Sequence, residues 1–233
     1  MLAVDEIKKL VAEKAAELVE RDMVLGIGSG STVVHFITAL SKKLKAGLQC
    51  ISVPTSSQTR LLATKHAIKL TELNDVSSID LTIDGADEMD HGLQLIKGGG
   101  GYLLQEKMVA VASKKLVIIA DHTKLKSHLG IFPLPIEVIP YGWKQVKQHI
   151  EGLYSIQTNL RTKEGKPFET DHGHYILDCS FKKISYPSTL NTSLHLIPGV
   201  VETGLFVDMC QQAIIGYEDG RIRIIKKELG IGN

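Results

Sequence analysis

The chain of 233 residues is long enough to bury a full core, as one large or two smaller domains. Its 27 Lys and Arg residues nearly balance its 26 Asp and Glu residues, and only 5% of residues are aromatic, so nucleic-acid binding is disfavoured. The three cysteines are widely spaced and form no CxxC pair, which indicates neither a disulfide framework nor a structural zinc site.

The location of the protein is predicted from its N-terminus and its hydropathy. The chain begins MLAVDEIKKL, is charged from its fifth residue and lacks the apolar core of a signal peptide. Nowhere do 18 apolar residues follow one another, so no transmembrane helix is indicated. We therefore expect a soluble, cytoplasmic protein without a membrane partner.

Helical and strand patterns alternate in the first half of the chain. Apolar residues are spaced as in helices within residues 5–20, 33–44, 56–66 and 103–112, and short apolar runs typical of strands cover residues 23–27, 48–53, 68–70, 79–83 and 116–120. Such alternation predicts an α/β fold with a parallel, doubly wound sheet and right-handed crossovers. Polar motifs follow Ile27, Ile83 and Ala120, at the strand ends where ligands of such sheets bind.

The pattern changes after Gly130. The proline-broken segment 132–140 is typical of a crossing between domains. Predicted helices at 142–152 and 187–195 and predicted strands near 153–161 and 174–181 then indicate an α+β region. The last apolar runs, at 204–207, 213–217 and 221–225, predict a strand and a hairpin that rejoin the first sheet.

A glycine- and hydroxyl-rich motif, residues 28–32 (GSGST), joins a predicted strand to a predicted helix. Backbone N–H groups at a helix N-terminus, supplemented by Ser and Thr hydroxyls, can bind an anion. The register is wrong for a dinucleotide, because Ser31 and Val33 stand where a third glycine is needed, and no Gly-Lys-Ser/Thr completes a Walker A loop. A single phosphate on a small molecule fits better, and a plain N-cap turn is the alternative.

Three acids and a lysine lie close together in the sequence. Asp84 and Asp87 follow a predicted strand, Lys97 precedes four glycines, and Glu106 lies in the first turns of a predicted helix. Acids that move protons, beside a cation that stabilises an oxyanion, are suited to proton abstraction next to a carbonyl. The alternatives are an acidic turn before a glycine-rich loop, a solvated helix-start glutamate and a divalent-metal site, which Lys97 would oppose.

Two further polar motifs leave their roles open. Lys124, after the strand at 116–120, either closes over a phosphate or faces solvent. His172 and His174 are two residues apart with no third ligand nearby, so surface or strand positions are more typical for them than a metal site.

Taken together, these motifs resemble ribose-5-phosphate isomerases of the A type. The matching stretches are GIGSGSTVVHF (26–36), the region 54–59, TIDGADEMD (82–90), KGGGGYLLQEK (97–107), ADHTK (120–124), FPLPIEVIP (132–140), TDHG (170–173) and IPGVVETGLF (197–206). They occur in the order and at the spacing of the family across nearly the whole chain. No single motif is decisive, but eight in register argue against coincidence.

The resemblance implies a fold and an activity. The expected fold is a Rossmann-like, doubly wound, mostly parallel sheet in a catalytic domain of residues 1–128 plus 205–233, with a smaller α+β lid domain, residues 129–204, inserted in it. The implied activity interconverts D-ribose 5-phosphate and D-ribulose 5-phosphate in the non-oxidative branch of the pentose phosphate pathway. The family uses no metal and no cofactor and is usually a homodimer or homotetramer.

The resemblance also implies roles for individual residues. Glu106 stands where the family has its proton-transferring base, and Asp84, Asp87 and Lys97 stand where the sugar ring is opened and the enediolate oxygens are held. The implied substrate-binding residues are Ser29, Gly30, Ser31 and Thr32 at the phosphate end, Gly85, Ala86, Gly98, Gly99 and Gly100 along the main chain, and the lysines Lys124 and Lys8.

This chain departs from the family pattern in two places. Ser29 stands where threonine is common, which keeps the hydroxyl. The stretch Thr-Asp-His-Gly-His at 170–174 stands where Thr-Asp-Asn-Gly-Asn is usual, which affects the lid domain and no catalytic residue.

Other functions are weighed against an isomerase. A non-catalytic sugar-phosphate sensor would share the phosphate loop but would not need Glu106 and Lys97 together. A sugar-phosphate deaminase or a lactonase on a similar scaffold would release ammonia or an acid. A nicotinamide dehydrogenase fits least, because the dinucleotide fingerprint is incomplete.

Overall fold

The computed structural model describes residues 1–227, which form parts of two compact units. The first unit comprises Met1–Gly85, Val109–Lys124 and the C-terminal segment from Asp208, and the second comprises Ala86–Met108 and Leu125–Val207. Across the described residues, no helix combines the length and the apolar character that a membrane crossing requires.

The first unit is built on a six-stranded sheet with the order β15-β14-β6-β3-β1-β2. Its strands are β1 (Val24–Ile27), β2 (Ile51–Pro54), β3 (Leu81–Asp84), β6 (Leu116–Asp121), β14 (Gln212–Gly216) and β15 (Ile222–Lys226). All neighbours are parallel except β14 and β15, which form an antiparallel hairpin at one edge. This confirms the predicted mostly parallel α/β sheet and the return of the C-terminal hairpin to it.

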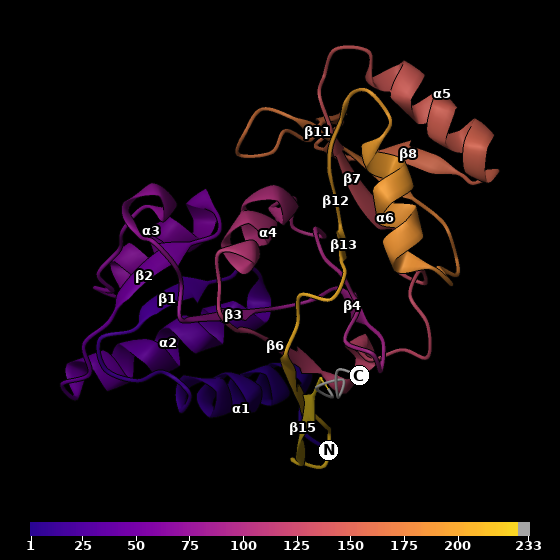
Figure 1. The fold of residues 1–233 in the computed structure, drawn as a ribbon. Helices are drawn as coiled ribbons and strands as arrows, with labels where there is room; N and C mark the ends of the chain where they lie inside the picture. The colour runs from indigo at the N-terminus through magenta and orange to yellow at the C-terminus, as the bar shows by residue number, and fades with distance from the viewer. Residues whose placement is uncertain (228–233) are drawn as a thin grey trace, which may run out of the picture. The chain divides into compact units, whose positions relative to one another are not determined.

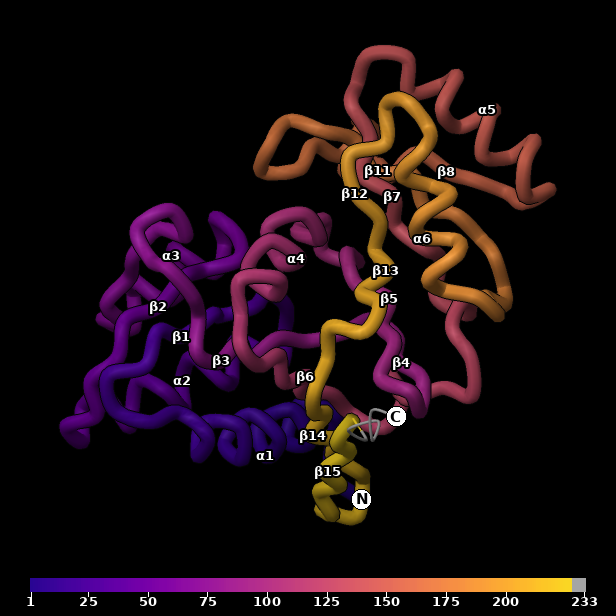
Figure 2. The backbone as a smooth tube through the Cα atoms, viewed as in Figure 1, coloured from indigo at the N-terminus to yellow at the C-terminus, as the bar shows by residue number. Residues whose placement is uncertain are grey.

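Helices cover the sheet because their apolar faces match its buried strands. The helices are α1 (Val4–Ala16), α2 (Ser31–Lys45) and α3 (Ser57–Lys65), with short 3-10 turns at Leu73–Asp75 and His122–Lys124. In Figure 1, α1 and α2 lie side by side along the sheet. Val11, Phe36 and Leu40 from these helices share one core with Leu25 and Ile119 of the strands. In Figure 2 the N-terminus lies beside β15. The Leu2 N–H donates to the carbonyl of Glu218, in the turn between β14 and β15, at 2.8 Å.

The second unit is α+β, as the sequence pattern predicts. Its four-stranded antiparallel sheet has the order β12-β7-β11-β8, and a three-stranded sheet has the order β13-β5-β4. The elements are β4 (Glu88–Met89), β5 (Leu95–Ile96), β7 (Leu134–Val138), α5 (Trp143–Tyr154), β8 (Thr158–Leu160), β9 (Thr162–Lys163), β10 (Lys166–Pro167), β11 (Tyr175–Cys179), α6 (Pro187–His195), β12 (Val200–Thr203) and β13 (Leu205–Phe206). Ile136, Leu177, Ile150 and Leu194 lie in its core. Helix α4 (Leu103–Val111) begins in this unit and ends in the first.

The strand expected at 204–207 does not rejoin the first sheet, so that part of the prediction is wrong. Strand β13 pairs antiparallel with β5 instead. The Lys97 N–H donates to the Gly204 carbonyl at 2.8 Å, and the Gly204 N–H donates to the Pro135 carbonyl at 2.7 Å. Backbone pairing on both sides therefore fixes this segment within the second unit.

The compact units and the predicted domains differ in where they place residues 86–108. The prediction assigns this segment to a catalytic domain of residues 1–128 plus 205–233, whereas its contacts group it with residues 125–207. The Lys107 ammonium, which donates to Glu202 at 2.6 Å and to the Thr203 carbonyl at 2.7 Å, is one reason. Residues 228–233 of the predicted domain lie outside the described residues, and the division into catalytic and lid domains stays a prediction.

Gly204 offers a test of the tight packing in the second unit. A Cβ at this position would lie 2.3 Å from the Lys97 carbonyl oxygen and 2.8 Å from Pro135 Cδ. Because neighbouring backbone would have to move apart, we expect Gly204→Ala to lower the free energy of unfolding by about 1–3 kcal/mol, measured by urea denaturation.

Gly152 is the matched control. It is exposed in α5, and a Cβ there would meet no atom within 4 Å. Gly152→Ala should therefore raise the free energy of unfolding by about 0.5–1 kcal/mol through helix propensity. A Gly204→Ala variant as stable as the parent would contradict the close approach at Gly204.

Candidate active site

In the first unit, the Asp84 carboxylate ties together the loop after β1 and the turn after β3. Asp84 is 1% exposed, and its Oδ1 accepts the N–H groups of Ser29 at 3.1 Å and Gly85 at 2.7 Å. A Cβ at Gly28 would lie 2.6 Å from the Asp84 Cα, so only glycine allows this approach. The structure thus brings Asp84 and Gly85 beside the predicted phosphate loop.

The Ser29 side chain lies in a buried cluster of hydroxyls. Its Oγ lies 2.7 Å from the Ser56 Oγ, 2.9 Å from the Thr55 Oγ1 and 3.0 Å from the Thr59 Oγ1. The Thr59 hydroxyl in turn donates to the Gly28 carbonyl at 2.8 Å. These hydroxyls fix the loop after β1 through hydrogen bonds, a role that the GSGST motif alone does not indicate. The three partners of the Ser29 hydroxyl, Thr55, Ser56 and Thr59, all lie in the region 54–59, one of the stretches on which the resemblance rests.

The predicted phosphate-end residues Gly30, Ser31 and Thr32 lie at the start of α2. Gly30, with a φ of +108°, precedes the helix, and Ser31 begins it. The Lys8 ammonium, from α1, donates to the Ser31 hydroxyl at 2.9 Å. Thr32 follows in the first turn of α2, and Lys124 ends the 3-10 turn after β6. Lys8 therefore lies at the predicted phosphate loop, and its role in binding a phosphate stays a prediction.

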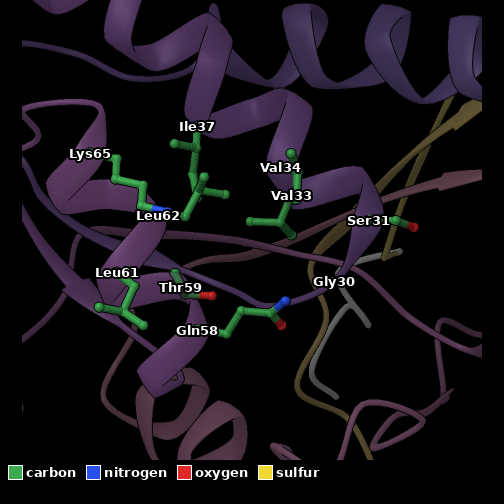
Figure 3. A pocket seen from close by; sticks show the side chains of 10 residues that line it. All are labelled: Gly30, Ser31, Val33, Val34, Ile37, Gln58, Thr59, Leu61, Leu62 and Lys65. Atoms are coloured by element: carbon green, nitrogen blue, oxygen red, sulfur yellow. The ribbon is translucent and has the colours of Figure 1, made fainter.

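A pocket of about 510 Å³ lies between α2 and α3, close to the same loop. It is lined by Gly30, Ser31, Val33, Val34, Ile37, Gln58, Thr59, Leu61, Leu62 and Lys65. Figure 3 shows the apolar side chains gathered on one side, while the Ser31 hydroxyl points away from them. This mostly apolar lining is not suited to a phosphate, so we do not place the candidate site in it.

In the second unit, the Lys97 ammonium and the Glu106 carboxylate form a buried ion pair. Lys97 Nζ lies 3.0 Å from Glu106 Oε1, and their side chains are 3% and 5% exposed. Lys97 Nζ also lies 5.5 Å from the centre of the Phe206 ring. Burial excludes the alternative that Glu106 is a solvated helix-start glutamate. The base and cation expected from the sequence are thus in direct contact.

The Asp87 carboxylate binds the glycine run that follows Lys97. The Gly99 N–H donates to Asp87 Oδ2 at 2.7 Å, and the Asp87 N–H donates to the Ile96 carbonyl at 2.9 Å. Ala86, Asp87, Gly98, Gly99 and Gly100 all belong to this unit. The second unit therefore brings Asp87, Lys97, the glycine run and Glu106 together, whereas Asp84 and the phosphate-end residues belong to the first.

Two residues that the sequence argument did not single out surround Glu106. Burial lowers the pKa of Lys107, and the neighbouring Glu202 partly offsets this shift. Burial raises the pKa of Tyr102, and the Asp171 and Glu106 carboxylates add to the effect. Lys107 is buried, whereas Tyr102 is only partly buried. The stretch 97–107 already contained both residues but did not indicate these contacts.

In the stretch 170–174, His174 lies against a buried glutamate. His174 Nδ1 lies 2.9 Å from Glu137 Oε1, which also accepts the Thr170 hydroxyl at 2.9 Å. Within residues 1–227, no three His, Cys, Asp or Glu side chains gather in a way that could hold a metal ion. His174 is therefore a partner of the buried Glu137.

Comparison with known proteins shows the family to which this chain belongs. The profile of the family described as ribose 5-phosphate isomerase A (phosphoriboisomerase A) matches residues 51–220. Ribose-5-phosphate isomerase A of Bacillus mycoides (strain KBAB4) is 51% identical over 215 residues, which cover 92% of this chain and 97% of the relative.

Solved structures of ribose-5-phosphate isomerases are also similar to this chain over nearly its whole length. Ribose 5-phosphate isomerase from Plasmodium falciparum aligns with a TM-score of 0.93 and 38% identity, over 96% of this chain and 99% of that one. A D-ribose-5-phosphate isomerase in complex with phospho-erythronic acid aligns with a TM-score of 0.94 and 38% identity, over 97% of this chain and 100% of that one. The fold and these matches define an isomerase. The chain belongs to the ribose 5-phosphate isomerase A family.

Proposed function

We propose that this chain interconverts D-ribose 5-phosphate and D-ribulose 5-phosphate through an enediolate, with the Glu106 carboxylate as general base. The observation that carries the proposal is the buried pair of Glu106 and Lys97, 3.0 Å apart. Membership of the family supports the substrate. A relative is described in complex with phospho-erythronic acid, a sugar acid that also carries a phosphate, which supports a phosphorylated sugar as ligand.

The proposed chemistry needs one base and one cation. Glu106 removes the proton from C2 of the open-chain aldose, and the C1 carbonyl becomes an enediolate oxygen. The same proton returns to C1 while a hydroxyl proton moves from O2 to O1, so the atoms of substrate and product balance. Lys97 stabilises the negative charge that develops on these oxygens. A carboxylate shielded from water keeps the proton for return instead of losing it to solvent.

The two aspartates are assigned to the oxygens of the sugar. Asp84 and Asp87 open the furanose ring and hold the enediolate oxygens. In support, each carboxylate is oriented by backbone N–H groups, Asp84 by Ser29 and Gly85, and Asp87 by Gly99. A fixed carboxylate loses little entropy when it binds the sugar, which favours catalysis by orientation.

The phosphate and the main-chain contacts complete the proposal. Backbone N–H groups at the start of α2 suit a phosphate, so Ser29, Gly30, Ser31 and Thr32 are assigned to it, with Lys8 and Lys124 as cations. Gly85, Ala86, Gly98, Gly99 and Gly100 are assigned to main-chain contacts with the sugar. The steps need only proton transfer and charge stabilisation, so the proposal includes no metal and no cofactor. A cytoplasmic location, the pentose phosphate pathway and a homodimer or homotetramer, implied by the resemblance, belong to the same proposal.

The first test replaces the proposed base. Glu106→Gln keeps the shape of the side chain but cannot accept the C2 proton, so we expect kcat to fall by roughly 10²–10⁴ while ribose 5-phosphate still binds. Formation of ribulose 5-phosphate is followed in a coupled assay, in buffer treated with a chelator.

The control for this test is Glu13→Gln, since Glu13 is an exposed glutamate on α1. It should leave kcat unchanged. Turnover close to that of the parent in Glu106→Gln would remove Glu106 from the role of base. A parent chain that forms no ketopentose phosphate would overturn the proposed activity.

The second test removes the proposed oxyanion cation. Lys97→Ala should lower kcat by about 10²–10³, the effect of losing one preorganised charge donor. The same change also leaves the Glu106 carboxylate without its ion pair, so we expect the free energy of unfolding to fall by about 3–5 kcal/mol. Lys9→Ala, at an exposed lysine of α1, is the control and should change neither quantity. If only thermal stability changed in Lys97→Ala, the oxyanion role would be wrong.

A further inference from the structure

Arg161 occupies an unusual position, because its guanidinium binds the backbone of the glycine run. Arg161 Nη1 donates to the carbonyl oxygens of Gly98 at 2.6 Å and Gly99 at 3.0 Å. These partners lie more than sixty positions away in the sequence, yet in the same compact unit. Arg161 belongs to none of the stretches that match the family motifs.

The direction of the Arg161 side chain is fixed by Asp178. Arg161 Nε donates to Asp178 Oδ2 at 3.0 Å and Nη2 donates to Asp178 Oδ1 at 2.5 Å, a two-pronged contact that orients the planar guanidinium. Their side chains are 14% and 25% exposed. The backbone of Arg161 is held as well, because its N–H donates to the Ile176 carbonyl and its carbonyl accepts the Phe168 N–H. With one edge of the guanidinium bound to Asp178, the Nη1 group is left to face the glycine carbonyls.

The run of four glycines needs such an anchor. Glycine has more backbone freedom than any other residue, and a run of them has no side chains with which to pack. The Phe168 ring gives a second contact, because it lies 6.0 Å from the Arg161 guanidinium and against Gly101, where a Cβ would approach it to 2.3 Å. Residues of the segment 158–178 thus order the loop from one side.

Peptide geometry relates the contacts of Arg161 to the directions of the neighbouring N–H groups. In a planar trans peptide, the C=O and the N–H point in opposite directions. Because the Gly98 carbonyl faces Arg161, the Gly99 N–H points away from it, and it does donate to the Asp87 carboxylate at 2.7 Å. By the same rule the Gly100 N–H, which shares a peptide with the Gly99 carbonyl, points away from Arg161. Arg161 and Asp87 therefore hold the peptide between Gly98 and Gly99 from opposite sides.

We propose that Arg161 is a positioning residue of the isomerase, which directs the Gly99 N–H to Asp87 and the Gly100 N–H toward the enediolate oxygens. This inference rests on the proposed function, because it assigns the glycine main chain and Asp87 to the sugar. Arg161 itself touches no reacting atom. Asp178 neutralises its charge, so its contribution is the direction of two peptides and not a further cation at the site.

The test measures steady-state kinetics of the full chain and of Arg161→Met, which keeps the length of the side chain but has no donor. We expect kcat to fall by about 10–100-fold, as for reacting groups displaced by roughly 1 Å, with KM changed less than about threefold. Phospho-erythronic acid, whose carboxylate carries charge near the reacting end, should bind weaker by a factor similar to the loss of kcat/KM. Inhibition by inorganic phosphate should be unchanged. A merely structural role would not separate these constants.

Two further variants and a control keep the result interpretable. Arg161→Lys keeps the charge but cannot reach Asp178 and the two carbonyls together, so kcat should fall although the protein folds, and Asp178→Asn should act in the same direction. If Arg161→Met does not unfold cooperatively, these two variants decide by the same criteria. Arg221→Met is the control, because Arg221 pairs with Asp219 at a site where both are exposed, and its kinetics should match those of the parent.

Folded variants of Arg161 with kcat within about twofold of the parent would overturn the inference, as would a loss of activity equal to the loss of folded protein. The proposed function fails separately, through an inactive parent chain or an unimpaired Glu106→Gln variant. An active parent, an impaired Glu106→Gln variant and normal Arg161 variants together would refute the role of Arg161 alone.

Discussion

The ion pair between Lys97 and Glu106 is the interaction on which the candidate site depends. Taking two charges out of water costs several kcal/mol for each ion, and their attraction offsets this only at close range. Here the two groups lie 3.0 Å apart with side chains 3% and 5% exposed. Replacing a buried ion pair by apolar residues of similar volume is often neutral or stabilising. A requirement of stability therefore does not explain the pair, whereas the proposed function, in which the base is shielded and its charge offset, would require it.

Burial of this pair is supported by polar contacts around it. Lys107, next to Glu106, is bound to Glu202 and to the Thr203 carbonyl, and its ammonium lies 4.9 Å from the centre of the Phe206 ring. The Lys97 N–H is bound to the Gly204 carbonyl. Because both lysines contact residues 202–206, this segment packs against the ion pair within the second unit. The same contacts explain why residues 86–108 group with residues 125–207.

The sequence predicted the parts of the structure that side-chain patterns control. Leu116–Ala120, an unbroken apolar run, is a fully buried strand, as its composition indicates. Strand β13 was assigned to the wrong sheet, because two residues carry no periodicity and backbone contacts of Gly204 choose the partner. The contacts of Arg161 could not be predicted either, because its partners are backbone carbonyls of glycines about sixty residues away. Nor does a serine in a glycine-rich turn reveal that its hydroxyl is turned inward, as that of Ser29 is.

Backbone N–H donors help to set the directions of the two proposed acids. Asp84 and Asp87 are three residues apart, but each is bound by N–H groups of its own compact unit, Asp84 by Ser29 and Gly85 and Asp87 by Gly99. A side-chain donor can rotate away at little cost, whereas a backbone N–H moves only with its peptide. Proton transfer and ring opening depend on direction as much as on distance. The glycines around both acids therefore supply N–H groups that approach a carboxylate closely. Because glycine has no side chain to restrict its backbone, other residues must fix the direction of these N–H groups. In the second unit, we assign this role to Arg161 and Asp178.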